Sequence, residues 1–426
     1  MRETITRDRN HPSVILWSLE NESPLESTVY GANIIRKATA LAHQLDPTRS
    51  TTSAASMPVN KNGYGEALDV VSYNYHWERA DADHLTFPDW KIGLISEYSA
   101  VRGRRGVYGI ENPADEHFKL YDGLIKSMYD VCTDVETSWQ RIKARDYLGG
   151  GCLWDNMDYW GEGSRWPIVA SGYGTIDMCF FPKDVYYYFV SQWTKKPMVH
   201  IFPHWTWPGK EGQVINVWGY TNCDEMELFL NGRSLGSQRR PEVTEKWTPE
   251  ERQNTPAKKS VIKPEHLLWR VPYHPGTLRA VGKINGQIIC SQEIHTADKP
   301  AQIKLSLAMT AFVAEKELKP LTADGKDVVV VKAAVLDKDG YPVPNADNLV
   351  QFDIQGEGKI IGVGNGDMVS HEPNKVDYRK AYNGLCAAIV QSGQKAGEIV
   401  LTAKSAGLKE GRISIRSVSA DTQLSH

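Results

Sequence analysis

The stretch "HPSVILWSLENES", residues 11–23, runs apolar almost without a break and then ends on carboxylates. Its apolar positions are Val14, Ile15, Leu16, Trp17 and Leu19. Such a run is typical of a parallel strand that is covered on both faces. In α/β folds the C-terminal ends of these strands are where catalytic groups lie. The position of Glu20, Asn21 and Glu22 after the run therefore indicates a catalytic role for a carboxylate at this strand end. A second carboxylate elsewhere in the chain is needed before a mechanism can be named.

Length and composition limit the classes of protein. With 426 residues the chain is too long for one ordinary core, so we expect two or three domains. A net charge of −3 gives no indication of nucleic acid or an anionic membrane as partner. No apolar run reaches a membrane-spanning length, and the first ten residues lack the apolar core of a signal peptide.

The six cysteines are widely scattered and show no CxxC or zinc spacing. We therefore expect free, buried thiols. No cofactor is expected. A divalent cation near the strand-end carboxylates stays open as an alternative, although the sequence does not show its ligands.

Up to residue 196 the chain alternates strand and helix patterns, which predicts a parallel sheet. The expected strands lie near residues 13–22, 49–56, 68–77, 91–98 and 149–155. The expected helices cover residues 27–45, a region that ends near 146, and residues 182–193. No GxGxxG or GxxxxGK[ST] follows a strand, which argues against a nucleotide-binding open sheet.

After residue 196 the pattern changes to short alternating strands. Turn pairs at Asn231-Gly232 and Asn285-Gly286 break them, as in β-hairpins. This pattern indicates a β-sandwich, and a second one begins near residue 298. The expected domains are therefore residues 1–196, 197–297 and 298–420.

The second carboxylate is Glu97, which ends the apolar strand pattern "IGLISEY". Two further strand candidates lie between Glu22 and Glu97. In an eight-stranded barrel, strands three steps apart face each other across the mouth, so their C-terminal ends converge. Two carboxyl groups about 5 Å apart are what retaining glycoside hydrolysis requires. The alternative for each is an ordinary glutamate at a strand end.

Several motifs resemble glycoside hydrolase family 2, which includes β-galactosidases, β-glucuronidases and β-mannosidases. "RDRNHPSVILWSLENES" (7–23) resembles the acid/base signature of that family. "ISEYSA" (95–100) is similar to its nucleophile strand. "DVVSYNY" (69–75) and "CLWDNMDYWGE" (152–162) resemble its sixth and eighth barrel strands.

The resemblance continues after the barrel motifs. "PMVHIFPHWTWPGKEGQVINVWGYTNCDEMELFLNGRSLG" (197–236) is similar to a sandwich domain of β-galactosidase-like members. "GEGKIIGVGNGDMVSHEP" (356–373) resembles their C-terminal sandwich. The resemblance therefore covers nearly the whole chain.

The resemblance implies a role for each matching residue. Glu22 would be the general acid/base, and Glu97 would be the nucleophile. Asn21 would hydrogen-bond the sugar 2-hydroxyl. Tyr75 would donate to Glu97, which would lower the pKa of that carboxyl and orient it. Trp154 would form the floor under the sugar ring, and its alternative role is that of a core tryptophan.

Glu20 departs from the family pattern, which places glycine before the asparagine of the acid/base motif. Its carboxylate could contact substrate, raise the pKa of Glu22 by like-charge repulsion, or face a helix. We favour the last of these.

Three arginines follow the second carboxylate. Arg102 and Arg104 could bind a uronate or a sulfate, because the guanidinium fork matches such anions. The alternative is a solvated basic loop. Arg105 is expected to be structural. The Asn-x-Lys pair of β-glucuronidases is not found between residues 160 and 185.

By the resemblance, the five expected strands are the fourth to eighth of a barrel. The expected fold is a partial (β/α)8 TIM barrel (strands 4–8) followed by two immunoglobulin-like β-sandwiches. Without strands 1–3 we expect the isolated chain to be impaired. It would be an excerpt of a longer enzyme, or the missing N-terminal half or a homo-oligomer would complete it. A periplasmic or extracellular location is suspected for the longer parent.

The expected function is that of a retaining exo-β-glycosidase of the β-galactosidase type, acting on an oligosaccharide or glycoside. A β-glucuronidase, or a hydrolase of another anionic β-glycoside, is the alternative among enzymes. The alternative outside enzymes is a non-catalytic carbohydrate-binding or scaffold module. Neither nucleic acid nor a membrane is expected as partner.

Overall fold

The structure is a computed structural model that describes residues 1–57, 62–112, 115–241 and 263–419. The chain forms two compact units. The first contains Met1–Ala100 and Thr133–Asp155; the second contains Val101–Cys132, Asn156–Pro241 and the chain from Glu265 onwards. The expected domain boundaries at residues 196 and 297 stay predictions. Part of the expected second domain, residues 242–262, lies outside the described residues.

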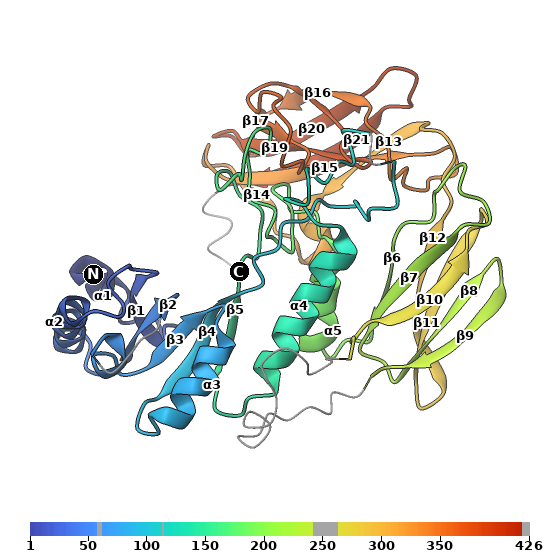
Figure 1. The fold of residues 1–426 in the computed structure, drawn as a ribbon. Helices are drawn as coiled ribbons and strands as arrows, with labels where there is room; N and C mark the ends of the chain where they lie inside the picture. Colours follow the sequence, from blue (N-terminus) through green and yellow to red (C-terminus); the bar gives the residue numbers. More distant parts are fainter. Residues whose placement is uncertain (58–61, 113–114, 242–262, 420–426) are drawn as a thin grey trace. The chain divides into compact units, whose positions relative to one another are not determined.

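The first unit is built on a five-stranded parallel sheet whose strands follow one another in chain order (Figure 1). These strands are β1 (Leu16–Asn21), β2 (Ser50–Ala55), β3 (Val71–Asn74), β4 (Ile92–Tyr98) and β5 (Gly150–Leu153). All five expected strands are therefore confirmed. The sequence placed the end of the third too late, since Tyr75 has a φ of 61° and leaves the extended conformation.

Helix α1 (Arg2–Asp8) precedes the first strand. The connections between the strands contain α2 (Val29–Leu45), the short 3-10 helix η1 (Tyr64–Glu66), α3 (Trp77–Thr86) and α4 (Met128–Lys143). The sequence predicted α2 and α4 but neither α1 nor α3. α2 begins where the Thr28 hydroxyl accepts a hydrogen bond from Gly31 N–H at 3.0 Å. Gly31 is required here, because an added Cβ would lie 2.2 Å from the Leu25 carbonyl oxygen.

The expectation that the opening apolar run is buried on both faces is wrong at its start. Ile15 is 73% exposed and precedes β1. Within the described residues β1 pairs only with β2, so it is an edge strand. Trp17 is the residue of β1 that enters the core, where it packs with Ile5 and Ala42.

The second unit contains α5 (Asp184–Trp193) and a first pair of sheets. One sheet has the order β10-β7-β6 and the other β12-β11-β8-β9 (Figure 1). Their strands are β6 (Val199–Phe202), β7 (Val214–Thr221), β8 (Glu225–Leu230), β9 (Arg233–Arg239), β10 (Leu267–Pro272), β11 (Thr277–Ile284) and β12 (Gln287–His295). The predicted hairpin turns are confirmed, with Asn231-Gly232 and Asn285-Gly286 all at positive φ.

A second pair of sheets follows, with the orders β13-β15-β19-β17 and β14-β21-β20-β16-β18. The strands of the first are β13 (Gln302–Leu307), β15 (Val328–Leu336), β17 (Gly358–Gly364) and β19 (Leu385–Ser392). Those of the second are β14 (Leu321–Thr322), β16 (Leu349–Gly356), β18 (Tyr378–Lys380), β20 (Gly397–Lys404) and β21 (Gly411–Val418). Short turns η2 (Ala308–Ala311) and η3 (Glu315–Glu317) precede β14. Apolar residues of both sheets, such as Val331, Phe352 and Leu401, form one buried core.

All six cysteines are free, as predicted. The expectation that they are buried is wrong for two of them: Cys152 is exposed and Cys290 is half-buried. Cys290 lies on β12, an edge strand of its sheet, which explains its exposure.

Candidate active site

The C-terminal ends of β1, β3 and β4 carry the polar residues that the sequence singled out. Glu22 follows β1, with a φ of 50° and its N–H donating to the Ala54 carbonyl at 2.9 Å. Tyr75 follows β3 and donates its N–H to the Glu97 carbonyl at 2.6 Å. A left-handed backbone at a non-glycine residue costs about 1 kcal/mol or more, and such residues cluster at functional sites.

Tyr75 and Glu97 are in direct contact. The Tyr75 hydroxyl donates to Glu97 Oε2 at 2.7 Å. This is the hydrogen bond that the family resemblance implied. Glu97 is half-buried and lies opposite Asn74 in the pairing of β3 with β4.

Asn74 is the residue of this site that the sequence analysis missed. Its Nδ2 donates to Glu22 Oε1 at 3.1 Å and to Asn21 Oδ1 at 3.0 Å. Its Oδ1 accepts from the Ser96 hydroxyl at 2.7 Å. The residue is fully buried, and these contacts use both donors and the acceptor of the amide. An asparagine in the strand "VVSYN", immediately before Tyr75, was the available signal.

These contacts bring three strand ends together. Glu22 and Asn21, from β1, meet the amide of Asn74, and Asn74 is the direct neighbour of Glu97 on β4. Neighbouring strands lie about 4.8 Å apart. Glu22 and Glu97 are thus linked to one buried residue in different ways: Glu22 accepts a hydrogen bond from the Asn74 side chain, and Glu97 is the strand neighbour of Asn74 on β4.

Glu20 does not face a helix, contrary to the favoured expectation. Its carboxylate accepts from the Ser53 hydroxyl on β2 and from Ser23 N–H, the latter at 3.0 Å. Burial is the main cause that raises the pKa of Glu20, and the charge of Glu22 adds a smaller increase. The side chain turns toward β2 because that strand offers the hydroxyl donor.

Glu26 is a fully buried carboxylate beside this strand end, and it too was missed. It accepts from Ser56 N–H at 3.3 Å and from Met57 N–H at 2.5 Å. Burial raises the pKa of Glu26, and the charges of Glu20 and Glu22 raise it further. Its contacts fasten the turn after β1 to the end of β2.

Trp154 follows β5 directly and is half-buried. The backbone N–H of Trp154 donates to the Tyr98 carbonyl at 2.9 Å, and this bond extends the pairing of β5 with β4 by one residue. Trp154 therefore belongs to the same sheet end as Glu97.

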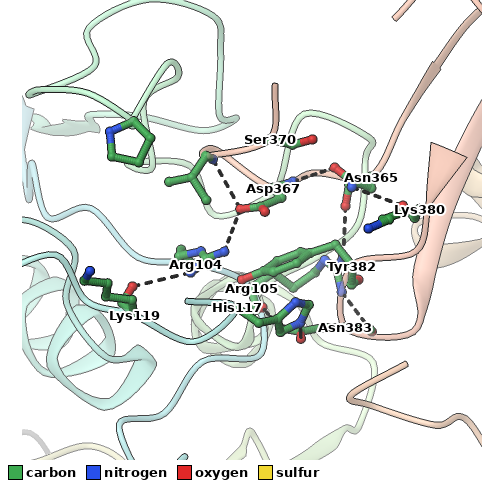
Figure 2. Close-up of polar contacts among 12 residues, drawn as sticks. Arg104, Arg105, His117, Lys119, Asn365, Asp367, Ser370, Lys380, Tyr382 and Asn383 are labelled. Atoms are coloured by element: carbon green, nitrogen blue, oxygen red, sulfur yellow. Dashed lines mark hydrogen bonds and ion pairs between the residues drawn. The ribbon is translucent and has the colours of Figure 1, made fainter. Parts of the chain in front are cut away.

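The three arginines belong to the second unit. Arg102 lies over the Tyr173 ring, 4.5 Å from its centroid, and donates to the Glu162 carbonyl at 3.0 Å. The two expectations for Arg104, an anion contact or a solvated loop, are both wrong. Arg104 is 2% exposed and pairs with Asp367 at 2.8 Å (Figure 2). The reason is a carboxylate from a distant loop that the sequence could not place.

Arg105 is structural, as expected. Its Nε pairs with buried Asp177 at 2.7 Å. Its Nη2 donates to the carbonyls of Tyr382 and Asn365, at 2.8 and 3.1 Å, as drawn in Figure 2. The arginine thus joins the chain after β4 to the loops that flank β18.

Among the described residues, no group of three or more His, Cys, Asp or Glu side chains is arranged to hold a metal ion. No helix in the described part of the chain has the length and apolarity needed to cross a membrane.

Family models match three parts of the chain. The model of the glycosyl hydrolases family 2 TIM barrel domain matches residues 1–87, and that of the glycoside hydrolase family 2 C-terminal domain 5 matches residues 313–414. Between them, a domain of unknown function (DUF4982) matches residues 212–290.

Individual relatives cover nearly all of this chain. The β-galactosidase BoGH2A of Bacteroides ovatus is 34% identical over 97% of the chain and 51% of its own length. A β-glucuronidase of Formosa agariphila is 24% identical over 99% of the chain and 39% of its own length. Among solved structures, a β-glycosidase from Bacteroides vulgatus has a TM-score of 0.77 at 30% identity. That match covers 96% of this chain and 52% of the other.

The chain therefore spans about half the length, or less, of the relatives it matches. The matched domain families and these relatives agree on one assignment. The chain belongs to glycoside hydrolase family 2 and corresponds to a C-terminal portion of its members.

Proposed function

We propose that this chain carries the two catalytic glutamates of a retaining exo-β-glycosidase that acts by double displacement. The observation that supports this most is the link through Asn74, which binds Glu22 and is the strand neighbour of Glu97. Retaining hydrolysis needs two carboxyl groups about 5–5.5 Å apart, on either side of the scissile bond.

Glu97 is the proposed nucleophile. It attacks the anomeric carbon and forms a covalent glycosyl-enzyme intermediate. A hydroxyl that donates to a carboxylate stabilises its ionised form, so the 2.7 Å bond from Tyr75 suits this role. The same bond holds the attacking group in place, which lowers the entropy cost of reaching the transition state.

Glu22 is the proposed general acid and base. It protonates the departing glycosidic oxygen in the first step and removes a proton from water in the second. Its side chain is exposed at the strand end, where a leaving group can reach it, while Asn74 holds one of its oxygens. Asn21 would bind the sugar 2-hydroxyl, and Trp154 would lie under the sugar ring.

The five parallel strands would be strands 4–8 of a (β/α)8 barrel, and the two pairs of sheets would be immunoglobulin-like sandwiches. Among the described residues β1 and β5 each pair on one side only. Unpaired edges of this kind favour association, so we expect the chain alone to hydrolyse glycosides poorly.

A β-galactoside is the proposed substrate, because the B. ovatus relative is named a β-galactosidase. An anionic β-glycoside such as a β-glucuronide is the second candidate. The F. agariphila relative is named a β-glucuronidase.

The test is Glu97→Gln, assayed with a panel of nitrophenyl β-glycosides. The assay uses this chain and a version restored with its upstream region. We expect Glu97→Gln to abolish turnover of the preferred glycoside while sugar binding remains. Glu3→Gln, the same change on exposed helix α1, should keep wild-type turnover. If the restored wild type hydrolyses none of the glycosides, the non-catalytic alternative gains support.

A further inference from the structure

Two cysteines of the second unit lie in contact without being bonded. Cys223 Sγ and Cys290 Sγ are 3.7 Å apart, although 67 positions separate the residues. Cys223 is buried in the turn between β7 and β8, whereas Cys290 is half-buried on β12. The proposed glycosidase chemistry uses neither thiol.

A glycine makes this contact possible. Gly282 on β11 lies opposite Cys290 in the pairing of β11 with β12, beside a bulge. A Cβ at Gly282 would lie 2.7 Å from Cys223 Sγ and 2.9 Å from Cys290 Sγ. Any side chain there would push the two sulfurs away, so the space that holds the pair depends on this glycine.

We propose that Cys223 and Cys290 form a disulfide by thiol–disulfide exchange with a small disulfide such as oxidised glutathione. In the first step the thiolate of one cysteine attacks the oxidant, forms a mixed disulfide and releases one glutathione thiolate. The second cysteine then attacks the protein sulfur of that mixed disulfide and releases the other glutathione. The protein loses two hydrogen atoms, and the oxidant gains them as two thiols.

The exposure of the two cysteines determines which of them reacts first with the oxidant. Cys290 lies on an edge strand next to the exposed side chains of Ile288 and Ile289, so the oxidant reaches it first. Cys223 is buried beside it and acts as the resolving cysteine. Burial, followed by the contact with Cys223, raises the pKa of the Cys290 thiol to about 11. The exchange should therefore be faster at pH 9 than at pH 7, because the thiolate is the attacking form.

The bond would connect elements that are not neighbours in the sheet. β11 lies between β8 and β12, and the disulfide would cross it above Gly282. It would tie the start of β8 to the edge strand and close a long loop of chain, which restricts the unfolded state.

The experiment treats the intact chain with oxidised glutathione, alkylates it under denaturing conditions and maps non-reduced peptides by mass spectrometry. We expect a cross-linked peptide that joins residues 223 and 290, and two fewer alkylated thiols. Reduction should restore both thiols. If both peptides keep free thiols, or carry only separate glutathione adducts, the proposal is wrong.

Two single variants test the order of the steps. Cys223→Ser should accumulate a stable glutathione adduct at Cys290, because the resolving thiol is absent. Cys290→Ser should leave Cys223 unmodified while the protein stays folded. An adduct that forms equally well on Cys223 would overturn the assigned order.

Glycine variants test the geometry. Gly282→Ala should slow cross-linking about tenfold, because an added methyl group separates the sulfurs. Gly397→Ala is the matched control, since a Cβ at that position meets nothing within 4 Å. Equal cross-linking rates in both variants would contradict the role given to Gly282.

Discussion

Asn74 donates a 3.1 Å hydrogen bond to Glu22 from a strand that is not the neighbour of β1. The strand between them, β2, ends in Ala54 and Ala55, and such short side chains are what a bridge across this strand requires. The contact sets the position of the proposed acid/base relative to β4, where Glu97 lies.

Replacing Asn74 should reduce turnover without unfolding the chain. In the version of the chain that is restored with its upstream region, we expect Asn74→Ala to lower kcat about 100-fold. The reason is that Glu22 and Asn21 lose the donor that they share. Asn74→Asp should lower it further, since a carboxylate would face Glu22. Asn33→Ala, on the exposed side of α2, is the control. Wild-type kcat in Asn74→Ala would contradict the positioning role.

Removing the Tyr75 hydroxyl should change the pH profile as well as the rate. Tyr75→Phe deletes the donor to Glu97 Oε2, and hydrogen bonds to charged groups contribute about 1.5–3 kcal/mol. We expect kcat/KM to fall about tenfold or more, and the acid limb of its pH profile to move to higher pH. Tyr30→Phe, at an exposed position of α2, should leave both unchanged. An unmoved acid limb would show that Tyr75 does not act through the ionisation of Glu97.

Asp46 should make the stability of the first unit depend on pH. Its carboxylate accepts from Thr48, from Arg49 and from Trp17 Nε1, and the Thr48 hydroxyl is the largest cause of its strongly lowered pKa. Because the folded pKa lies below the unfolded value, the stabilisation is complete above about pH 4 and is lost as the pH falls below it.

The measurement for Asp46 compares urea midpoints of the wild type and Asp46→Asn. The variant should unfold at lower urea at pH 7, and the difference should shrink steadily between about pH 4 and pH 2. A difference that stays constant over this range would show that the carboxylate charge is not what stabilises the fold.

Two ion pairs of the second unit should differ widely in their contribution to stability. Arg105 pairs with Asp177 in the interior, so Arg105→Ala leaves a buried charge and should cost about 3–5 kcal/mol of unfolding free energy. Arg165 pairs with Asp122 at the surface, so Arg165→Ala should cost about 1 kcal/mol or less. Urea denaturation of both variants provides the comparison. Similar losses would contradict the burial argument.

The sequence by itself determined the strands, two of the hairpin turns and the family. An apolar run of several residues, as in β4, predicts a parallel strand from the segment alone, although the buried strand β2 consists of serine, threonine and alanine. Asn231-Gly232 and Asn285-Gly286 favour the left-handed turn wherever they occur. The same local signals do not show that α1 and α3 are helices, because α1 buries only Ile5 and α3 only Ala80 and Asp81.

Only the tertiary structure decided which polar groups meet. Asn74 reaches Glu22 across 52 positions, and Arg104 reaches Asp367 across 263. Cys223 and Cys290 touch because the pairing of β11 with β12 places Gly282 beneath them. The energy of a buried polar group depends on the partner that the fold brings to it, and no local pattern in the chain records that partner.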